Sequence, residues 1–337
     1  MVCGGDSCNK NGVFDLNNAA NRDNCYHPYY LLKNEFYEKD ILLNTYDYLD
    51  KDIDKNYSLI FFDMPNSTRE FIDIHPSIEK YLVIWECAII KPINWDISLH
   101  KYFKKIFTWD DSYIDNKKYF KINFPNKIPD NLGFITNKKD KFCTIIAGNK
   151  SSSHRLELYS ERVKAIRWFE QNHPEDFDLF GIGWDKLFFK SPFSKLNRLE
   201  FLQKLCKPNF PSYRGIIQSK KNILNKYKFS ICYENVKDIP GYVTEKIFDC
   251  FFAGCVPIYF GAPNIDDHVP KDTFIDKRSF TSYEELYRYL TTMNEKEYDN
   301  YINNIKNFLA SDKIYQFSSE YFAETIIRET TNTAVSQ

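Results

Sequence analysis

Short apolar runs recur along the chain and alternate with longer segments of helical character. In the first half the runs 57–62 (YSLIFF), 81–85 (YLVIW) and 106–109 each predict a buried strand, because they are apolar, rich in β-branched or aromatic residues, and bounded by polar residues. Residues 27–37 predict a helix, and 42–46 predict a short strand. Residues 1–25 are polar and give little structural signal.

The second half shows the same alternation of strands and helices, with clearer signals at the ends of the elements. Strands are predicted at 142–147, 177–181, 228–233 and 256–260. Helices are predicted at 154–171, 193–205, 245–252, 283–292, 295–309 and 316–328, followed by a disordered tail from 329 to 337. Strands that alternate with helices indicate parallel sheets in an α/β protein.

A polar stretch at 117–141 separates the two halves and indicates a crossover between two domains. We therefore expect an N-terminal domain at 1–140, a C-terminal domain at 141–310, and a closing helix with a disordered tail at 311–337. The length of 337 residues suits two α/β domains.

Composition excludes some classes of function. Lys and Arg number 45 and Asp and Glu 46, so bulk nucleic-acid binding is not indicated. The chain shows neither a charged-then-apolar leader nor an apolar run of about eighteen residues, so we expect no membrane span and a cytoplasmic location, with peripheral membrane association left open. Nine cysteines without a CxxC pair fit a reducing compartment, and Cys232, Cys250 and Cys255 are expected to be buried.

The candidate functional side chains are most closely spaced between residues 229 and 280. Glu234 and Asn235 end an apolar strand, and Tyr242, Glu245 and Lys246 lie around the start of the next helix. A helix N-terminus beside the carboxyl ends of strands is where α/β sheets bind anions. A lysine there suits a diphosphate, while a carboxylate and an amide suit sugar hydroxyls. The alternative is a generic βαβ unit with a polar loop.

This segment closely resembles the donor-binding motif of the α-1,3-fucosyltransferase family. The resemblance rests on three ordered matches: Glu234-Asn235, then YVTEK at 242–246, then VPIY at 256–259 with the Gly-x-Pro turn at 261–263. It is strongest over 140–310 and weaker over 80–125. The loop between Asn235 and Tyr242 is longer by one residue than in some bacterial members, which makes its contacts with the nucleotide less certain.

The resemblance implies an α/β fold of the GT-B type, with two Rossmann-like domains facing a cleft. It also implies inverting transfer of L-fucose from GDP-fucose to an acceptor glycan, in α-1,3 or α-1,4 linkage to an N-acetylglucosamine or glucose-type residue. Because no anchor is visible, the chain looks like a soluble, bacterial-type member acting on a surface glycan; the alternative is a sequence from which an anchor has been trimmed. Two alternatives stay open: use of another GDP-linked deoxyhexose or heptose, and a non-catalytic glycan-binding protein.

Glu86 is the candidate general base. It follows the strand at 81–85, and the family keeps a glutamate in the corresponding loop; the alternative is a surface carboxylate. Asp63, Asp110 and Asp111 also follow strands and are the fallback candidates.

The remaining candidates contact the donor. Arg155, four residues before Tyr159, is expected to bind the diphosphate, or else to be a solvated arginine at a helix start. Lys246 is the second cation, Glu245 is expected to bind sugar hydroxyls, and Asn235 and Tyr242 are expected to contact the donor. Further candidates are Tyr213, Lys220 as a third cation or a surface charge, and Gly181 and Gly183 as places of close backbone approach or merely of a turn.

No metal site is predicted. The adjacent pairs Asp110-Asp111 and Asp266-Asp267 read as loop or capping carboxylates rather than a metal motif. We therefore expect no required cofactor, with GDP-fucose as donor substrate and divalent cations as stimulants at most.

Overall fold

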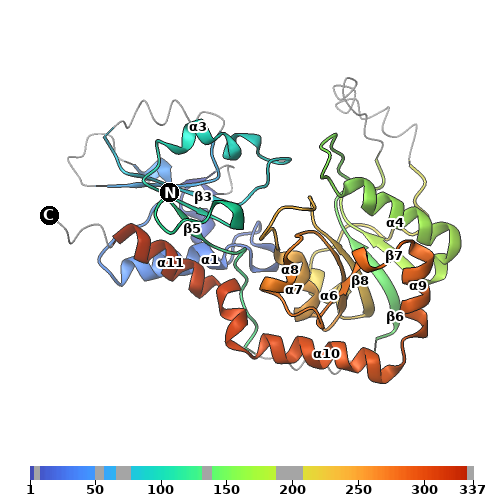
Figure 1. Cartoon of the computed structure of the whole chain (residues 1–337). Coiled ribbons are helices and arrows are strands. Elements are labelled where there is room, and N and C mark those ends of the chain that lie inside the picture. Colours follow the sequence, from blue (N-terminus) through green and yellow to red (C-terminus); the bar gives the residue numbers. More distant parts are fainter. Residues whose placement is uncertain (4–7, 50–56, 66–76, 131–138, 187–207, 332–337) are drawn as a thin grey trace. The chain divides into compact units, whose positions relative to one another are not determined.

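The computed structural model describes residues 1–3, 8–49, 57–65, 77–130, 139–186 and 208–331. The chain divides into two compact units, each an α/β arrangement (Figure 1). Unit 1 contains Met1–Pro129, Ile239–Glu245 and Ser311–Gln337, and unit 2 contains Asp130–Asp238 and Lys246–Ala310. The chain therefore returns to unit 1 twice, whereas the sequence suggested one boundary near residue 140 and a closing segment after 310.

Unit 1 is built on a parallel sheet of five strands in the order β1-β2-β3-β4-β5. Its strands are β1 (Val2–Cys3), β2 (Leu59–Phe62), β3 (Lys80–Ile84), β4 (Lys105–Thr108) and β5 (Tyr119–Lys121). The predicted strands at 57–62, 81–85 and 106–109 are confirmed. β1 and β5 were not predicted, and residues 42–46 form no strand.

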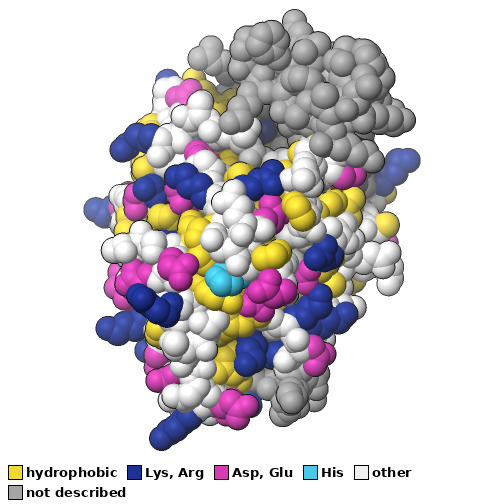
Figure 2. Space-filling view, turned by 90° about the vertical axis from the view of Figure 1, so that its right-hand side faces the viewer, with side chains coloured by type: hydrophobic (Ala, Val, Ile, Leu, Met, Phe, Trp, Pro, Cys, Tyr) yellow, Lys and Arg dark blue, Asp and Glu magenta, His cyan; other side chains and the backbone are white. Residues whose placement is uncertain are grey.

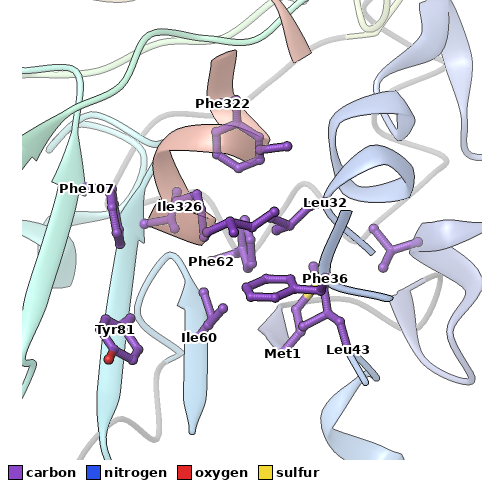
Figure 3. Close-up of a cluster of buried hydrophobic side chains, with 14 of the residues drawn as sticks. Met1, Leu32, Phe36, Leu43, Ile60, Phe62, Tyr81, Phe107, Phe322 and Ile326 are labelled. Carbon is purple, nitrogen blue, oxygen red and sulfur yellow. The ribbon is translucent and has the colours of Figure 1, made fainter. Parts of the chain in front are cut away.

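Alternate residues of these strands pack on opposite faces of the sheet. Ile60 and Phe62 join the core beneath helices α1 (His27–Tyr37) and α11 (Ser319–Thr331), while Leu59 and Phe61 face a second core with α3 (Ile97–His100). Figure 3 shows the first core, in which Phe322 and Ile326 of α11 lie near Phe62. Both faces are covered, which explains the unbroken apolar runs in the sequence.

Unit 2 has a second parallel sheet, in the order β10-β9-β8-β6-β7. Its strands are β6 (Lys141–Ile146), β7 (Phe177–Phe180), β8 (Tyr227–Tyr233), β9 (Val256–Phe260) and β10 (Ile275–Asp276). Its helices are α4 (Tyr159–Asn172), α6 (Lys220–Leu224), α8 (Ile265–His268), α9 (Tyr283–Thr292), α10 (Glu295–Leu309) and α7 (Glu245–Phe252), whose first residue is assigned to unit 1.

Most predicted elements of this half are confirmed. A capping box between Asn294 and Glu297 begins α10 where the sequence placed it. Gly254, at a φ of 60°, follows α7 as expected of a C-terminal glycine. The helix expected from 154 begins only at Tyr159, and α11 runs to Thr331, into the segment predicted to be disordered. The helix predicted at 193–205 lies outside the described residues.

Surface features agree with the balanced composition. On the face shown in Figure 2, Lys and Arg side chains are interspersed with Asp and Glu among the residues drawn in colour. Within the described ranges, no helix is both long enough and apolar enough to cross a membrane. The three cysteines predicted to be buried, Cys232, Cys250 and Cys255, are buried.

Candidate active site

The strand order of unit 2 marks a binding crevice. From β6 the chain goes first to β7 on one side, then crosses to β8 on the other side of β6 and continues to β9 and β10. The loops that leave the carboxyl ends of β6 and β8 therefore diverge. In open α/β sheets this reversal point is where ligands bind.

A paired lysine lies at the β8 side of this crevice. The Lys246 Nζ atom, in the first turn of α7, lies 3.1 Å from Oε2 of Glu234, which directly follows β8. Glu234 is completely buried, whereas the Lys246 side chain keeps about a quarter of its surface exposed. The buried carboxylate holds the ammonium at the end of the sheet while leaving part of it accessible to an anion.

Asn235 is held by an arginine that sequence analysis missed. Arg162 of α4 is buried, and its NH2 group donates to the Tyr233 carbonyl at 2.7 Å and to Oδ1 of Asn235 at 3.1 Å. A guanidinium only donates hydrogen bonds, so the amide oxygen of Asn235 faces Arg162 and its NH2 end points elsewhere. The available signal was a charged residue on the otherwise apolar face of α4.

Arg155 lies in the connection from β6 to α4, four residues before the first helical residue. Its side chain is exposed. The nearby Glu157 carboxylate accepts the backbone N–H of Ser160 at 2.9 Å, which stabilises the start of α4. Arg155 is thus a cation at a helix N-terminus, where the helix dipole also favours an anion.

Glycines shape the loop after β7. Gly181 has a φ of 131° and Gly183 a φ of 89°, both in the region that favours glycine. The Tyr213 hydroxyl donates to the Gly181 carbonyl at 2.9 Å, and the side-chain amide of Asn149 donates to the Gly183 carbonyl at 3.0 Å. Tyr213 therefore supports this loop.

Gly181→Ala is expected to destabilise the fold. A Cβ atom at Gly181 would lie 2.0 Å from the carbonyl oxygen of Ala147, and the backbone conformation is itself strained for alanine. We expect a loss of about 2 kcal/mol or more, which for a unit of this size lowers the Tm by roughly 4 °C or more. Thermal unfolding measures this effect.

Gly148→Ala is the matched control, because the nearest atom to its added Cβ lies 3.9 Å away. Equal melting temperatures for the two variants would show that the loop tolerates a side chain at Gly181.

Lys220 pairs with a carboxylate of a neighbouring helix. Its Nζ atom lies 2.7 Å from Oδ2 of Asp249 on α7, and the ion pair joins α6 to α7. Lys246 is also paired with a carboxylate, so this contact does not choose between the two roles considered for Lys220, third cation or surface charge.

Tyr242 lies differently from the prediction that it contacts the donor. Its side chain is 1% exposed, and its ring centroid is 4.5 Å from that of Trp109 within unit 1. The ring is part of a core and lacks the exposed surface that ligand contact requires. Glu245 is half-buried at the first position of α7.

In unit 1, Glu86 follows β3 on a well-ordered loop. Oδ1 of Asp63 accepts the backbone N–H groups of Trp85 at 2.8 Å and Glu86 at 3.1 Å. The Glu86 carbonyl in turn accepts the indole N–H of Trp95 at 3.0 Å. The backbone of Glu86 is therefore fixed, while its side chain is half-exposed.

The fallback carboxylates have structural partners. Burial raises the pKa of Asp63, although hydrogen bonds from the Trp85 and Glu86 N–H groups oppose this. Burial likewise raises the pKa of Asp110, whose carboxylate caps a short helix by accepting the N–H of Ser112 at 2.9 Å. Asp111 pairs with Lys121 at 2.6 Å. All three fallback carboxylates therefore have structural roles in unit 1.

A cavity of about 300 Å³ lies in unit 1 beside the Glu86 loop. Its wall includes the aromatic side chains of Tyr29 and Trp85, together with the charged groups of Asp63 and Lys91. Apolar and aromatic walls with a few polar groups are typical of small-molecule pockets.

One group of possible metal ligands exists among the described residues. Ligand atoms of His173, Glu175 and Asp176 lie within 4.8 Å of one another. They precede β7 at the amino end of the sheet, and the candidate site lies at the opposite, carboxyl end. The candidate site itself contains cations and amide donors, which suit a diphosphate.

Comparison with known proteins agrees with this chemistry. Residues 206–327 match the family model described as Glycosyltransferase family 10 (fucosyltransferase) C-term. This part of the chain is similar to the C-terminal part of glycosyltransferase family 10. The matched part contains β8, α7 and β9, and therefore Glu234, Asn235 and Lys246 of the site.

Curated relatives of family 10 match over short segments. An alpha-(1,3)-fucosyltransferase of Helicobacter pylori is 35% identical over 74 residues, which are 22% of this chain and 15% of that protein. An alpha-(1,4)-fucosyltransferase of Arabidopsis thaliana is 42% identical over 72 residues, or 21% of this chain and 18% of that one. The matched segments thus span less than a fifth of either relative.

Solved structures show the same fold over most of the chain. A crystal structure of an alpha1,3-fucosyltransferase with GDP-fucose aligns with a TM-score of 0.52 and 14% identity, covering 98% of this chain and 90% of that chain. The Anabaena protein HepE, in complex with UDP-glucose, aligns with a TM-score of 0.52 and 9% identity over 81% of this chain and 78% of its own. The fold is therefore α/β of the GT-B type, as predicted.

Proposed function

We propose that the protein is an inverting fucosyltransferase that transfers L-fucose from GDP-fucose to a hydroxyl of an acceptor glycan. The linkage would be α-1,3 or α-1,4, to an N-acetylglucosamine or glucose-type residue. The observation that carries this proposal is the ion pair between Lys246 and the buried Glu234 at the reversal point of the sheet. The family 10 match and the fucosyltransferase relatives support the choice of donor.

Leaving-group stabilisation is assigned to unit 2. As the bond between C1 of fucose and the diphosphate oxygen breaks, GDP takes the electron pair and gains negative charge. Lys246, Arg155 and the N-termini of α4 and α7 would stabilise that charge, because oriented cations and N–H groups are most effective where charge develops. The amide of Asn235, oriented by Arg162, would donate to a donor oxygen.

Acceptor activation is assigned to unit 1. The acceptor oxygen attacks C1 from the face opposite GDP, which inverts its configuration, and the acceptor proton passes to the carboxylate of Glu86. The cavity beside the Glu86 loop has aromatic walls and two charged groups, which suit a sugar ring of the acceptor. Glu245 would bind hydroxyl groups of the donor.

GDP is expected to bind more tightly than UDP. The expectation rests on the similarity to fucosyltransferases, one of which was solved with GDP-fucose. The diphosphate is common to both ligands, so any difference in affinity reports recognition of the base. Titration calorimetry with the two nucleotides measures it. Equal or stronger binding of UDP contradicts the choice of GDP-fucose.

Nucleotide release from a panel of GDP-linked sugars separates the remaining alternatives. Release from GDP-fucose together with an acceptor glycan is the expected result. Release from another GDP-linked deoxyhexose or heptose alone would change the donor. Tight GDP binding without release from any sugar would identify a non-catalytic binding protein.

A further inference from the structure

Two isoleucine side chains are exposed at the carboxyl end of the sheet in unit 2. Ile182, in the loop after β7, is 56% exposed, and Ile216 is 64% exposed. Among the described residues of unit 2, Tyr289 on α9 is the only other large hydrophobic residue classed as exposed, at 39%. Single exposed hydrophobic residues are ordinary, but two on adjoining loops at a binding edge indicate a contact surface.

Hydrogen bonds join the loops that carry the two isoleucines. The backbone N–H of Gly181 donates to the Gly215 carbonyl at 3.0 Å, and the Tyr213 hydroxyl donates to the Gly181 carbonyl at 2.9 Å. On the β6 side, the backbone N–H of Asn149 donates to the Ile182 carbonyl at 2.9 Å. The loops after β6 and β7 and the segment at 213–216 therefore form one ledge, on which the isoleucines are held by fixed backbone.

Gly215, beside Ile216, has room for a side chain. Apart from its own chain neighbours, no atom of the described residues lies within 4 Å of a Cβ placed on Gly215. In contrast, a Cβ atom on Gly181 would overlap the Ala147 carbonyl. The ledge is thus closely packed at Gly181, while Ile182 and Ile216 keep more than half of their surface exposed.

We propose that Ile182 and Ile216 form the platform on which the nucleobase of the nucleoside diphosphate donor packs. The proposal rests on the proposed function, because it takes the diphosphate to lie between Lys246 and Arg155. The strand order β8-β6-β7 places the ledge two strand spacings from the end of β8, roughly 9 to 10 Å. The ribose would cross the end of β6 at Asn149.

Apolar packing explains why aliphatic side chains are held at this position. A purine presents two flat, weakly hydrated faces, and removing such surface from water is favourable in proportion to its area. Two aliphatic side chains on a preformed ledge supply that contact with little loss of conformational entropy. The platform contributes affinity for the base.

The test is the double variant Ile182→Ser/Ile216→Ser, titrated with GDP and with inorganic pyrophosphate. Both side chains are exposed, so the substitutions should leave folding intact. We expect GDP affinity to fall about tenfold, which corresponds to ~1.4 kcal/mol, because the apolar contact with the base is lost. Pyrophosphate affinity should stay unchanged, because pyrophosphate has no base.

Tyr289→Ser is the matched control, since it removes an exposed aromatic residue of the same unit and should change neither affinity. Unchanged GDP affinity in the double variant, with GDP bound by the wild type, overturns the platform alone. An equal loss for GDP and pyrophosphate also overturns it, because the loops would then act through the diphosphate site. A wild-type protein that does not bind GDP overturns the proposed function and the platform together.

Discussion

Glu86→Gln is expected to slow sugar transfer by about two to four orders of magnitude, the usual contribution of general-base catalysis. Glutamine keeps the size and polarity of the side chain but cannot accept the acceptor proton. The side chains of Asp63 and Trp95 hydrogen-bond to the backbone N–H and carbonyl of residue 86. These bonds do not involve the side chain of residue 86, so the substitution should leave the loop in place. The turnover number and the pH–rate profile, which should lose its acidic limb, are the measurements.

The affinity of Glu86→Gln for GDP shows whether Glu86 acts as the general base or as a ligand of the donor. Because Glu86 belongs to unit 1 and the candidate diphosphate ligands Lys246 and Arg155 to unit 2, the Kd for GDP should stay near the wild-type value. Glu35→Gln, on the exposed surface of α1 in the same unit, is the matched control and should retain full turnover.

Two results would reassign the role of Glu86. Unchanged turnover in Glu86→Gln would move the base to Asp63, Asp110 or Asp111. Loss of GDP binding would instead place Glu86 among the donor ligands.

Lys246→Ala and Arg155→Ala are each expected to reduce transfer by about two or more orders of magnitude, as for removal of one preorganised charge-stabilising group. Both variants should also bind GDP more weakly, since each removes a cation from the diphosphate site. Lys271→Ala, which removes an exposed lysine of the same unit, should change neither quantity. Transfer rates and calorimetric Kd values for GDP measure the effects.

Lys246→Ala needs a second variant, because the lysine also pairs with a buried carboxylate. Removing it leaves the wholly buried Glu234 without its ammonium partner, which destabilises the fold. The double variant Glu234→Gln/Lys246→Ala removes that buried charge. It should recover thermal stability while remaining inactive. Recovery of activity in the double variant would show that Lys246 acts only on stability.

Local signals in the sequence predicted most elements of unit 2. The helices α9 (Tyr283–Thr292) and α10 (Glu295–Leu309) and the strand β9 (Val256–Phe260) have the expected bounds, because each has its own periodicity and end signals. Elements without such signals were missed. β5 (Tyr119–Lys121) is only half-buried and β1 (Val2–Cys3) has two residues, so both exist chiefly by pairing with neighbouring strands.

The positions of two candidate site residues could be predicted for the same reason. Arg155 lies between β6 and α4, and Lys246 lies in the first turn of α7, after β8. In a parallel sheet that order in the chain already places a residue at the carboxyl edge. Lys220 was ambiguous because a lysine near a helix start can face a ligand or a neighbouring helix. In the structure Lys220 contacts Asp249 of the neighbouring helix α7.

The sequence by itself therefore determined the alternation of strands and helices, the polar residues at the strand ends and the likeness of 229–280 to a donor-binding motif. The tertiary structure alone decided which unit each segment joins, as for Ile239–Glu245 and Ser311–Gln337. It also decided that Tyr242 is buried against Trp109 and that Arg162 holds Asn235. These contacts join residues 73 to 133 positions apart, whereas propensity and periodicity act over one or two turns of chain.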